Sequence, residues 1–440
     1  MAKQYDLVIV GGGPAGLMAA RVAGENGLRT ALLERKTTLT TVRRVDGGGL
    51  SPINEYLCGE KLTFNPEAKR IGFPASGFSV RYDGPHRDLY GFRIFSPNGT
   101  RICFGDYDTL SRDPLKNRVG VALDKGLLLK GLYEDARAAG AELFLNTNVT
   151  AIEPGADGIT VTGNDKPYRG SFVIAADGIN SRIARLMGMN KERKFISTMV
   201  DRVWNIEGVD IPQVVGISFI LTDYGNFFVS RVCREGNYHV GASSYNPADD
   251  LGARLNRFFY EDPVYSGWFK GAKKTEEHAC VVNILSSIKE PFKDNVLFVG
   301  DAAWLMELSN PFAILCGWKA ANAVTLAVLD GKINKEGIMS YLQWWDEKFY
   351  GPHGQAEFKP IHLHDYIDAA STDYLASLIK EPFPSTMNFY KLFGTIGGAY
   401  AELFPTIGEE RPDVMEKMMG LANEMDEIEL KARKAGFPNR

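Results

Sequence analysis

Cysteine is scarce in this sequence, and long apolar runs are missing. The 440 residues include only five cysteines, none of them in a C-x-x-C pair: Cys58, Cys103, Cys233, Cys280 and Cys316. We therefore expect reduced thiols and no disulfide framework. No stretch of about 18 uncharged apolar residues occurs, and the chain runs from Met1 into a strand-like segment without a secretory signal. These features predict a cytoplasmic protein.

An excess of positive charge and a metal-ligand pattern are missing too. The formal net charge is -4, and acidic and basic residues are interspersed. Because no basic stripe is available to follow a phosphate backbone, binding of nucleic acid is not expected. Prolines interrupt the segment that contains His353, His362 and His364, so no metal site is predicted. The hydrophobic fraction of 45% suits a folded chain with a substantial core.

The N-terminal segment has the order strand, glycine-rich turn, helix, strand. Tyr5–Val10 is a short apolar run, typical of a buried parallel strand. A helix is predicted to begin near Pro14 and to end before Gly27, and Arg29–Leu33 forms the next strand. This order predicts a Rossmann-type βαβ unit.

The turn between the first strand and the helix has the pattern G-x-G-x-x-G. Gly11 permits the tight turn, Gly13 lets backbone approach a pyrophosphate, and Gly16 allows close helix–strand contact. Glu34 ends the second strand, where a carboxylate can accept hydrogen bonds from both hydroxyls of an unphosphorylated ribose. The pattern indicates FAD or NAD; the alternative is a glycine-rich turn that binds no ligand. The predicted dinucleotide contacts are Gly11, Gly13, Pro14, Ala15, Gly16, Glu34 and Arg35.

Two later strands each end in an aspartate. Phe172–Ala176 is followed by Asp177 and Gly178, and the apolar run that starts at Asn295 is followed by Gly300 and Asp301. Ligands of open α/β sheets bind at this carboxyl edge of the strands, and Asp301 is placed to accept a hydrogen bond from a ribityl hydroxyl of a flavin. The alternative for each aspartate is a cap on the helix that follows it. Together with the first motif, these segments favour FAD, with Asp177, Gly178, Gly300 and Asp301 among its contacts.

These motifs, taken in this order, resemble those of the aromatic-hydroxylase-like FAD-dependent oxidoreductase superfamily. Within it, the stretch Arg44–Pro52 resembles the geranylgeranyl reductases, which commonly have Pro-Cys-Gly-Gly-Gly-Leu-Ser there. The resemblance implies noncovalent FAD, with Gly48 and Gly49 among its contacts. It also implies that Arg118 approaches the flavin and that the backbone of Val149 meets the adenine.

Two departures from the family pattern affect this expectation. Asp46 replaces the usual cysteine, and a carboxylate does not have the chemistry of a thiol. The stretch Asn310–Ala321 follows the Gly-Asp strand, where the family often has a glycine-rich loop beside the flavin, but retains only Gly317. We expect a helix from Trp318 to Leu329, with Cys316 before it as a flavin neighbour or as a small buried apolar residue.

The fold class predicted from these patterns is mixed α/β. We expect a discontinuous Rossmann-type FAD-binding domain (1–190 and 287–330), an antiparallel-sheet substrate domain (191–286) and a C-terminal helical cap (331–440). The aromatic segment Tyr224–Phe228 either lines an apolar pocket or belongs to the core of the substrate domain. The cap either covers substrate, supports dimerisation, touches a membrane surface or is simply core.

The resemblance implies hydride transfer from flavin N5 to carbon–carbon double bonds of an apolar, prenyl-type substrate. One alternative is a flavin monooxygenase that hydroxylates an aromatic compound, and another is a flavin electron carrier or partner-binding subunit. No second dinucleotide-binding fold is visible, so the electron donor is either NAD(P)H that docks transiently or a ferredoxin-like protein. The sequence indicates neither the catalytic proton donor nor the oligomeric state.

Overall fold

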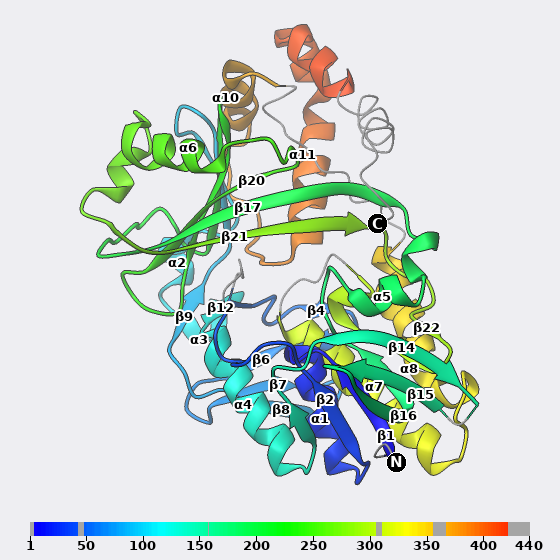
Figure 1. The fold of residues 1–440 in the computed structure, drawn as a ribbon. Helices are drawn as coiled ribbons and strands as arrows, with labels where there is room; N and C mark the ends of the chain where they lie inside the picture. Colours follow the sequence, from blue (N-terminus) through cyan, green and yellow to red (C-terminus); the bar gives the residue numbers. More distant parts are fainter. Residues whose placement is uncertain (1–3, 43–47, 157, 305–309, 355–366, 421–440) are drawn as a thin grey trace.

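The computed structural model describes residues 4–42, 48–156, 158–304, 310–354 and 367–420. Its two large sheets lie in separate layers, with long strands of the second sheet passing over the first (Figure 1). This arrangement confirms the predicted mixed α/β class.

The first sheet has eight strands, of which the central ones are parallel. Val10, the last residue of the central strand, pairs with Leu33 on one side and with Ala175 on the other. The central parallel strands are nearly uniform apolar runs because both faces of the sheet are buried there. The strands are β1 (Gln4–Val10), β2 (Thr30–Leu33), β13 (Glu142–Phe144), β14 (Val149–Gly155), β15 (Gly158–Gly163), β16 (Lys166–Ala175), β22 (Phe292–Lys293) and β23 (Val296–Phe298).

Helix α7 (Asn310–Leu329) crosses helix α1 (Pro14–Glu25) at very short range. A Cβ atom on Gly317 would lie 2.1 Å from the carbonyl oxygen of Ala15, so only glycine fits at the crossing. The helix predicted from Trp318 therefore begins at Asn310, and the stretch expected as a loop forms its first turns. By length and by a mean hydropathy of 1.6, α7 is apolar enough to cross a membrane, but 67% of that window is buried inside the protein, as in a core helix.

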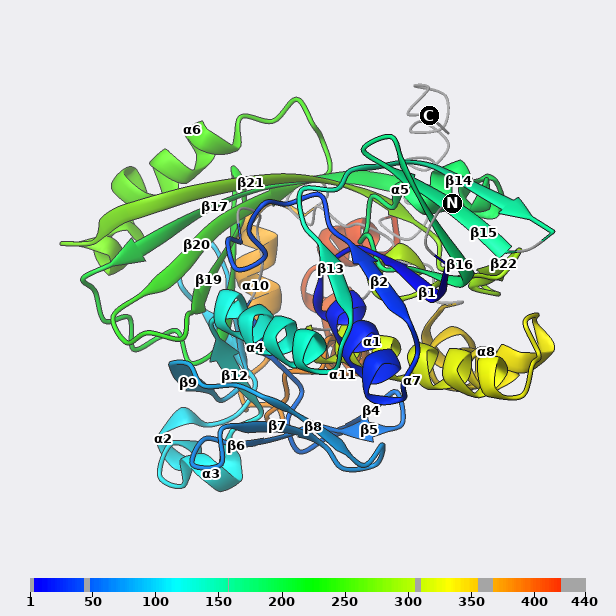
Figure 2. The same cartoon turned by 60° about the horizontal axis from the view of Figure 1, so that its bottom comes forward.

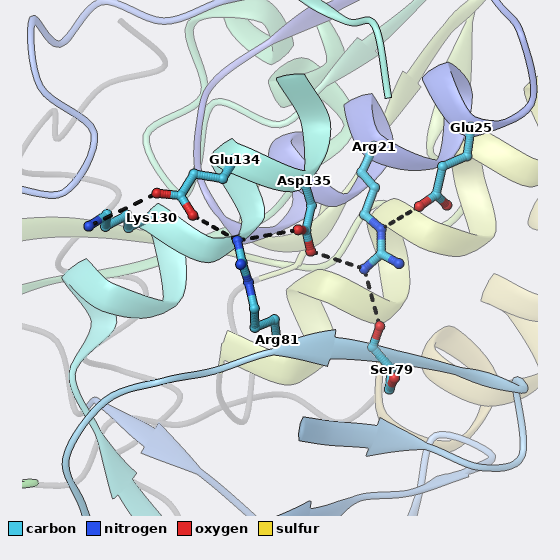
Figure 3. A network of polar contacts seen from close by, with 7 residues as sticks. All are labelled: Arg21, Glu25, Ser79, Arg81, Lys130, Glu134 and Asp135. Atoms are coloured by element: carbon cyan, nitrogen blue, oxygen red, sulfur yellow. Dashed lines mark hydrogen bonds and ion pairs between the residues drawn. The ribbon is translucent and has the colours of Figure 1, made fainter. Parts of the chain in front are cut away.

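An ion-pair network ties α1 to helix α4 (Lys125–Ala138) and to strand β8 (Phe78–Arg81) (Figure 3). Arg21 forms an ion pair with Asp135 at 3.6 Å and donates to the carbonyl oxygen of Ser79 at 3.1 Å. Arg81 contacts Glu134 at 2.7 Å. Since the side chains of Arg81 and Glu134 remain about half exposed, their ion pair contributes at most about 1 kcal/mol.

The second sheet has seven strands, two of which come from an unexpected part of the chain. Residues 92–103 fall within the range assigned from the sequence to FAD binding, yet they join this sheet because Phe92 pairs with Ile217 in a parallel register. The sequence-based boundary at residue 190 therefore does not separate the two sheets. The strands are β10 (Phe92–Phe95), β11 (Arg101–Cys103), β17 (Phe195–Glu207), β18 (Ile217–Thr222), β19 (Gly225–Arg231), β20 (Tyr238–Ser244) and β21 (Lys273–Leu285).

The two faces of the second sheet differ in what covers them. Trp204 and Phe227 face helix α6 (Leu251–Asn256) and the helical turn η2 (Arg257–Glu261), where the ring of Phe227 stacks on Phe258 at 4.2 Å. Phe227 is thus core, as one of the two interpretations of its segment proposed. Phe228 alternates to the other face of the second sheet, as the strand period requires. Helix α6 lies on the side of β17 and β21 that faces away from α1 and α4 (Figure 2).

The described part of the C-terminal region, predicted as a helical cap (331–440), packs against both sheets. Helix α8 (Met339–Trp345) packs against the first sheet, where the Tyr341 hydroxyl donates to the carbonyl oxygen of Phe298 at 3.0 Å. Helix α11 (Phe389–Glu410) lies instead against the second sheet, with Phe389 5.0 Å from the ring of Phe92. The aromatic residues of this region therefore divide between two apolar surfaces. Those of α8 pack at the first sheet, and those of α11 pack at the second.

The remaining elements are short and connect these layers. They are β3 (Gly49–Leu50), β4 (Tyr56–Leu57), β5 (Glu60–Lys61), β6 (Thr63–Asn65), β7 (Arg70–Phe73), β9 (His86–Leu89), β12 (Gly120–Leu123), α2 (Tyr107–Leu110), α3 (Pro114–Asn117), α5 (Arg182–Leu186), η1 (Met189–Glu192), η3 (Ser266–Phe269), η4 (Gly300–Ala302), η5 (Glu336–Ile338), η6 (Asp346–Gly354) and α10 (Ala369–Leu378).

Candidate FAD-binding site

The three motif glycines between β1 and α1 meet different surroundings. Gly11 has a φ of +108°, and a Cβ atom there would lie 2.3 Å from the carbonyl oxygen of Ala176. A Cβ atom on Gly16 would lie 1.9 Å from the carbonyl oxygen of Gly11. A Cβ atom on Gly13, by contrast, would meet nothing within 4 Å. Two of the glycines thus serve close packing, and the third leaves open space beside the backbone.

The start of α1 suits an anion. Pro14 occupies the first turn, Gly13 is the N-cap without a side-chain hydrogen bond, and no acidic residue lies in the first turn. The helix dipole and the backbone N–H groups of this turn, including those of Ala15 and Gly16, favour negative charge at this end. A pyrophosphate therefore fits the open side of Gly13.

Glu34 holds its carboxylate beside the glycine loop. It is only 7% exposed. Its Oε2 accepts a hydrogen bond from Gly12 N at 2.6 Å, and its Oε1 accepts one from Lys36 N at 2.8 Å. Each carboxylate oxygen has a second lone pair for a ribose hydroxyl. Arg35 is exposed next to it.

Val149 starts the strand that lies next to this carboxylate. Thr147 N donates to the carbonyl oxygen of Glu34 at 2.8 Å, which brings the start of β14 to the end of β2. The structure thus places the residues predicted for ribose and adenine side by side, although they are far apart in the sequence.

We expect Glu34→Gln to weaken FAD binding about tenfold or more, because a charge-assisted hydrogen bond contributes roughly 1.5–3 kcal/mol. The amide group would also set an NH2 against one of the two backbone N–H donors that the carboxylate now satisfies. Titration of the apoprotein with FAD, followed by flavin fluorescence, measures the change. Glu25→Gln, on the exposed side of α1, is the matched control. Equal FAD affinity in Glu34→Gln and wild type would contradict a ribose contact.

Asp177 caps the helix that follows it. Its carboxylate accepts hydrogen bonds from Ser181 Oγ at 2.6 Å, Arg182 N at 2.7 Å and Ile183 N at 3.0 Å. Burial raises the pKa of Asp177, while these hydrogen bonds act in the opposite direction. Asp177 therefore caps the start of the next helix, which is the alternative that the sequence offered for this side chain. Gly178 follows it with a φ of +83°.

Gly300 and Asp301 form the turn η4 directly after β23. Gly300 has a φ of +57°, and a Cβ atom there would be 3.7 Å from the Cβ atoms of both Ala15 and Ala313. Because β1, β16 and β23 are adjacent and parallel, the residues that follow them share one edge of the sheet. The structure thus brings the glycine loop, Asp177 and Asp301 together at the edge where cofactors of such sheets bind.

Gly48 and Gly49 lead into strand β3, which pairs with β12. Gly48 has a φ of +55°, and its carbonyl oxygen accepts a hydrogen bond from Leu123 N at 2.6 Å. The rest of the motif, Arg44–Gly47 with Asp46, lies outside the described residues, as do His362 and His364. In the described part of the chain, no group of three or more potential ligands gathers in a metal-like arrangement.

Arg118 lies buried just before β12, the strand that pairs with β3. One guanidinium nitrogen contacts Asp88 at 3.1 Å, another donates to the carbonyl oxygen of Phe64 at 2.5 Å, and the group lies over the Phe64 ring. Its Nε is buried without a hydrogen-bond partner among the described residues. The contacts with protein orient this side chain, and one donor is left for a ligand.

Cys316 lies within the buried part of α7, close to Tyr341 of α8. The surroundings that the structure gives it are those of a small apolar core residue, one of the two alternatives that the sequence left open. A contact between this thiol and the flavin remains a prediction.

A cavity that the sequence did not indicate lies between the second sheet and the junction of β12 with α4. It has a volume of about 620 Å³, and its lining includes Leu123 and Asp124 from this junction and Val203, His239 and His278 from the second sheet. These residues come from separate strands, and no local motif marks them.

The described residues fit FAD: the open side of Gly13 accommodates a pyrophosphate, and the fixed carboxylate of Glu34 accommodates a ribose. The family profile of pyridine nucleotide-disulphide oxidoreductases matches residues 5–220. The chain is an FAD-dependent oxidoreductase.

The similarity to individual proteins is more specific. It is 26% identical to a digeranylgeranylglycerophospholipid reductase of Methanoculleus marisnigri, over 90% of this chain and 94% of that one. A solved geranylgeranyl bacteriochlorophyll reductase-like protein of Thermoplasma acidophilum has the same fold, with a TM-score of 0.69 and 20% identity over 96% and 100% of the two chains. These findings confirm the resemblance to geranylgeranyl reductases.

The fold is shared more widely. A solved p-nitrophenol 4-monooxygenase of Pseudomonas putida matches with a TM-score of 0.59 and 15% identity, over 97% of this chain and 99% of that one. Fold alone therefore does not distinguish a reductase from a hydroxylase.

Proposed function

We propose that this enzyme reduces carbon–carbon double bonds in the prenyl chains of an apolar lipid, with FAD bound along the carboxyl edge of the first sheet. The observation that carries the proposal is the match, along nearly the whole of both chains, to a digeranylgeranylglycerophospholipid reductase. Two aromatic side chains support it. Phe219 packs against Phe92 and Phe389, and Phe228 pairs with it on the same face of the second sheet, which suits an isoprenoid chain.

FAD, once reduced, supplies two electrons as a hydride from N5 of its ring. The chain positions this group. Glu34 would hold the ribose, the open side of Gly13 would admit the pyrophosphate, and Asp301 would hold the ribityl chain. The second sheet covers the first and excludes water from the double bond, so the cofactor and the target bond meet in an apolar space. Arg118 and the glycines Gly48 and Gly49 complete the wall beside the ring.

Electrons reach the flavin from NAD(P)H that docks transiently or from a ferredoxin-like protein. The lipid substrate arrives through peripheral contact with a membrane surface. Under anaerobic conditions, each donor can be tested separately by mixing it with the oxidised holoprotein and following loss of the flavin absorbance.

An anaerobic stopped-flow experiment tests the reaction itself. The holoprotein is reduced and then mixed with a digeranylgeranylglyceryl phospholipid in detergent micelles. The flavin absorbance at about 450 nm is followed. We expect rapid return of the absorbance together with a saturated lipid product. Return only in the presence of oxygen, with hydroxylation of an aromatic compound, would establish a monooxygenase instead. Return only with a protein acceptor would establish an electron carrier.

A further inference from the structure

Asp201 is a buried acid on β17, the strand next to the edge of the second sheet. It is 7% exposed and lies on β17 between two partner strands. Ser243 of β20 donates a hydrogen bond from its hydroxyl to Oδ1, and the Cys280 thiol of β21 donates to Oδ2 at 3.3 Å. Within the part of the chain that the structure describes, no cationic side chain pairs with Asp201. An acid in such surroundings is costly to ionise.

The strand period places Asp201 on the face that looks toward the FAD-binding sheet. Val200, Trp204 and Ile206 of β17 pack into the core beside α6. The alternate residue Val203 is buried but does not belong to that core. Asp201 lies two positions from Val203, so its side chain emerges on the same face of β17, opposite α6.

A direct contact ties this part of the second sheet to the cofactor edge of the first. Asn180, three residues after Asp177, donates from its side chain to the carbonyl oxygen of Val281 at 3.1 Å and accepts from Asn283 N at 3.4 Å. Both partners lie on β21 immediately beyond Cys280. The loop that leaves the carboxyl edge of β16 is therefore attached to the strand that carries a partner of Asp201.

We propose that Asp201 delivers the proton that completes reduction of the double bond, an inference that rests on the proposed function. Saturation of a double bond requires a hydride at one carbon and a proton at the other. The flavin supplies the hydride and is oxidised by two electrons. The carboxyl O–H bond of Asp201 breaks, a C–H bond forms at the second carbon, and the O–H electron pair remains on the carboxylate. Water then returns a proton to Asp201.

The surroundings of Asp201 keep its proton available. Burial raises the pKa of Asp201, while the hydrogen bonds from Ser243 and Cys280 lower it. The titratable groups that face it are Cys280 on β21 and Tyr245 at the end of β20. Because the folded-state pKa is raised, the acid keeps its proton to higher pH than an exposed aspartate does. The rate of reduction should therefore fall as the pH rises through that pKa.

Asp201→Asn tests the inference, because asparagine keeps the size of the side chain and cannot deliver a proton. We expect lipid-dependent reoxidation of the reduced flavin to slow roughly 100-fold or more, with the FAD content and Tm of wild type. Asp223→Asn, in the exposed turn between β18 and β19, is the matched control and should react as wild type does.

Two further readouts separate proton delivery from a structural role. Infrared spectroscopy of the wild-type holoprotein should show a protonated carboxyl band that titrates with the descending limb of the pH–rate profile and is lost in Asp201→Asn. Ser243→Ala removes a hydrogen bond that favours the carboxylate, so it should move both the band and the limb to higher pH. If Asp201→Asn binds less FAD or has a lower Tm than wild type, the Ser243→Ala variant alone tests the inference. A descending limb of the pH–rate profile that does not move in Ser243→Ala would overturn it.

The outcomes for the two proposals differ. If the reduced wild-type flavin is not reoxidised by any prenyl lipid, the proposed function fails, and proton delivery fails with it. If wild type reacts and Asp201→Asn matches its rate and pH profile, only the assignment of Asp201 is overturned.

Discussion

Gly16→Ala is expected to unfold at a far lower temperature than wild type and to be purified without FAD. The added Cβ would lie 1.9 Å from the carbonyl oxygen of Gly11 and 3.3 Å from the Cβ of Ala176. Both neighbours belong to the backbone or to a short side chain, so neither can turn away. Overpacking of this kind costs about 1–3 kcal/mol or more. Differential scanning calorimetry of the apoprotein and the flavin content of the purified protein measure the two effects.

Gly394→Ala is the matched control for this change. Gly394 lies on the exposed side of α11, where an added Cβ meets nothing within 4 Å. Alanine favours a helix by about 1 kcal/mol over glycine, so this variant should keep or raise the Tm and bind FAD normally. A Gly16→Ala protein with the Tm and flavin content of wild type would show that α1 does not pack on the turn as described.

Gly13→Ala is expected to separate cofactor binding from stability. In the folded protein, nothing lies within 4 Å of the added Cβ, and the residue has a φ of -78°, which alanine adopts without strain. The apoprotein should therefore keep the Tm of wild type. The methyl group would nevertheless occupy the space assigned to the pyrophosphate, and a clash of about 1–3 kcal/mol corresponds to a roughly 5- to 150-fold weaker affinity for FAD.

The measurement for Gly13→Ala is a fluorescence titration of apoprotein with FAD beside a thermal unfolding curve of the same sample. Unchanged FAD affinity would remove Gly13 from the cofactor site. A lower Tm of the apoprotein would mean that Gly13 serves packing, as Gly11 and Gly16 do. Only a weaker affinity together with an unchanged Tm matches the open space beside this residue.

Elements formed by neighbouring residues could be predicted closely. The strand predicted at Tyr5–Val10 is Gln4–Val10, and the helix predicted from Pro14 begins at Pro14 and ends at Glu25. The cap alternative for Asp177 also follows from residues within six positions of it. In each case the hydrogen bonds and the apolar period lie within one short segment, so the signal does not depend on the rest of the chain.

Elements formed by distant partners could not be predicted. Strand β10 joins the second sheet through β18, more than a hundred residues further along the chain. The close crossing of α7 and α1 depends on Gly317 meeting the backbone of Ala15, and the division of the C-terminal region depends on two apolar surfaces formed elsewhere. A residue pattern specifies that a segment is apolar, but not which of several apolar surfaces it will cover.

The amino-acid sequence by itself determined the βαβ unit, its glycine loop and the acid at the end of β2, because the turn, the helix start and the strand period are local properties. Only the tertiary structure decided what surrounds them. Asp201, Ser243 and Cys280 are dozens of residues apart, and strand register alone brings them together. The burial of Asp201 and the contact through Asn180 arise when the two sheets pack, since burial is a property of the whole fold and not of any segment.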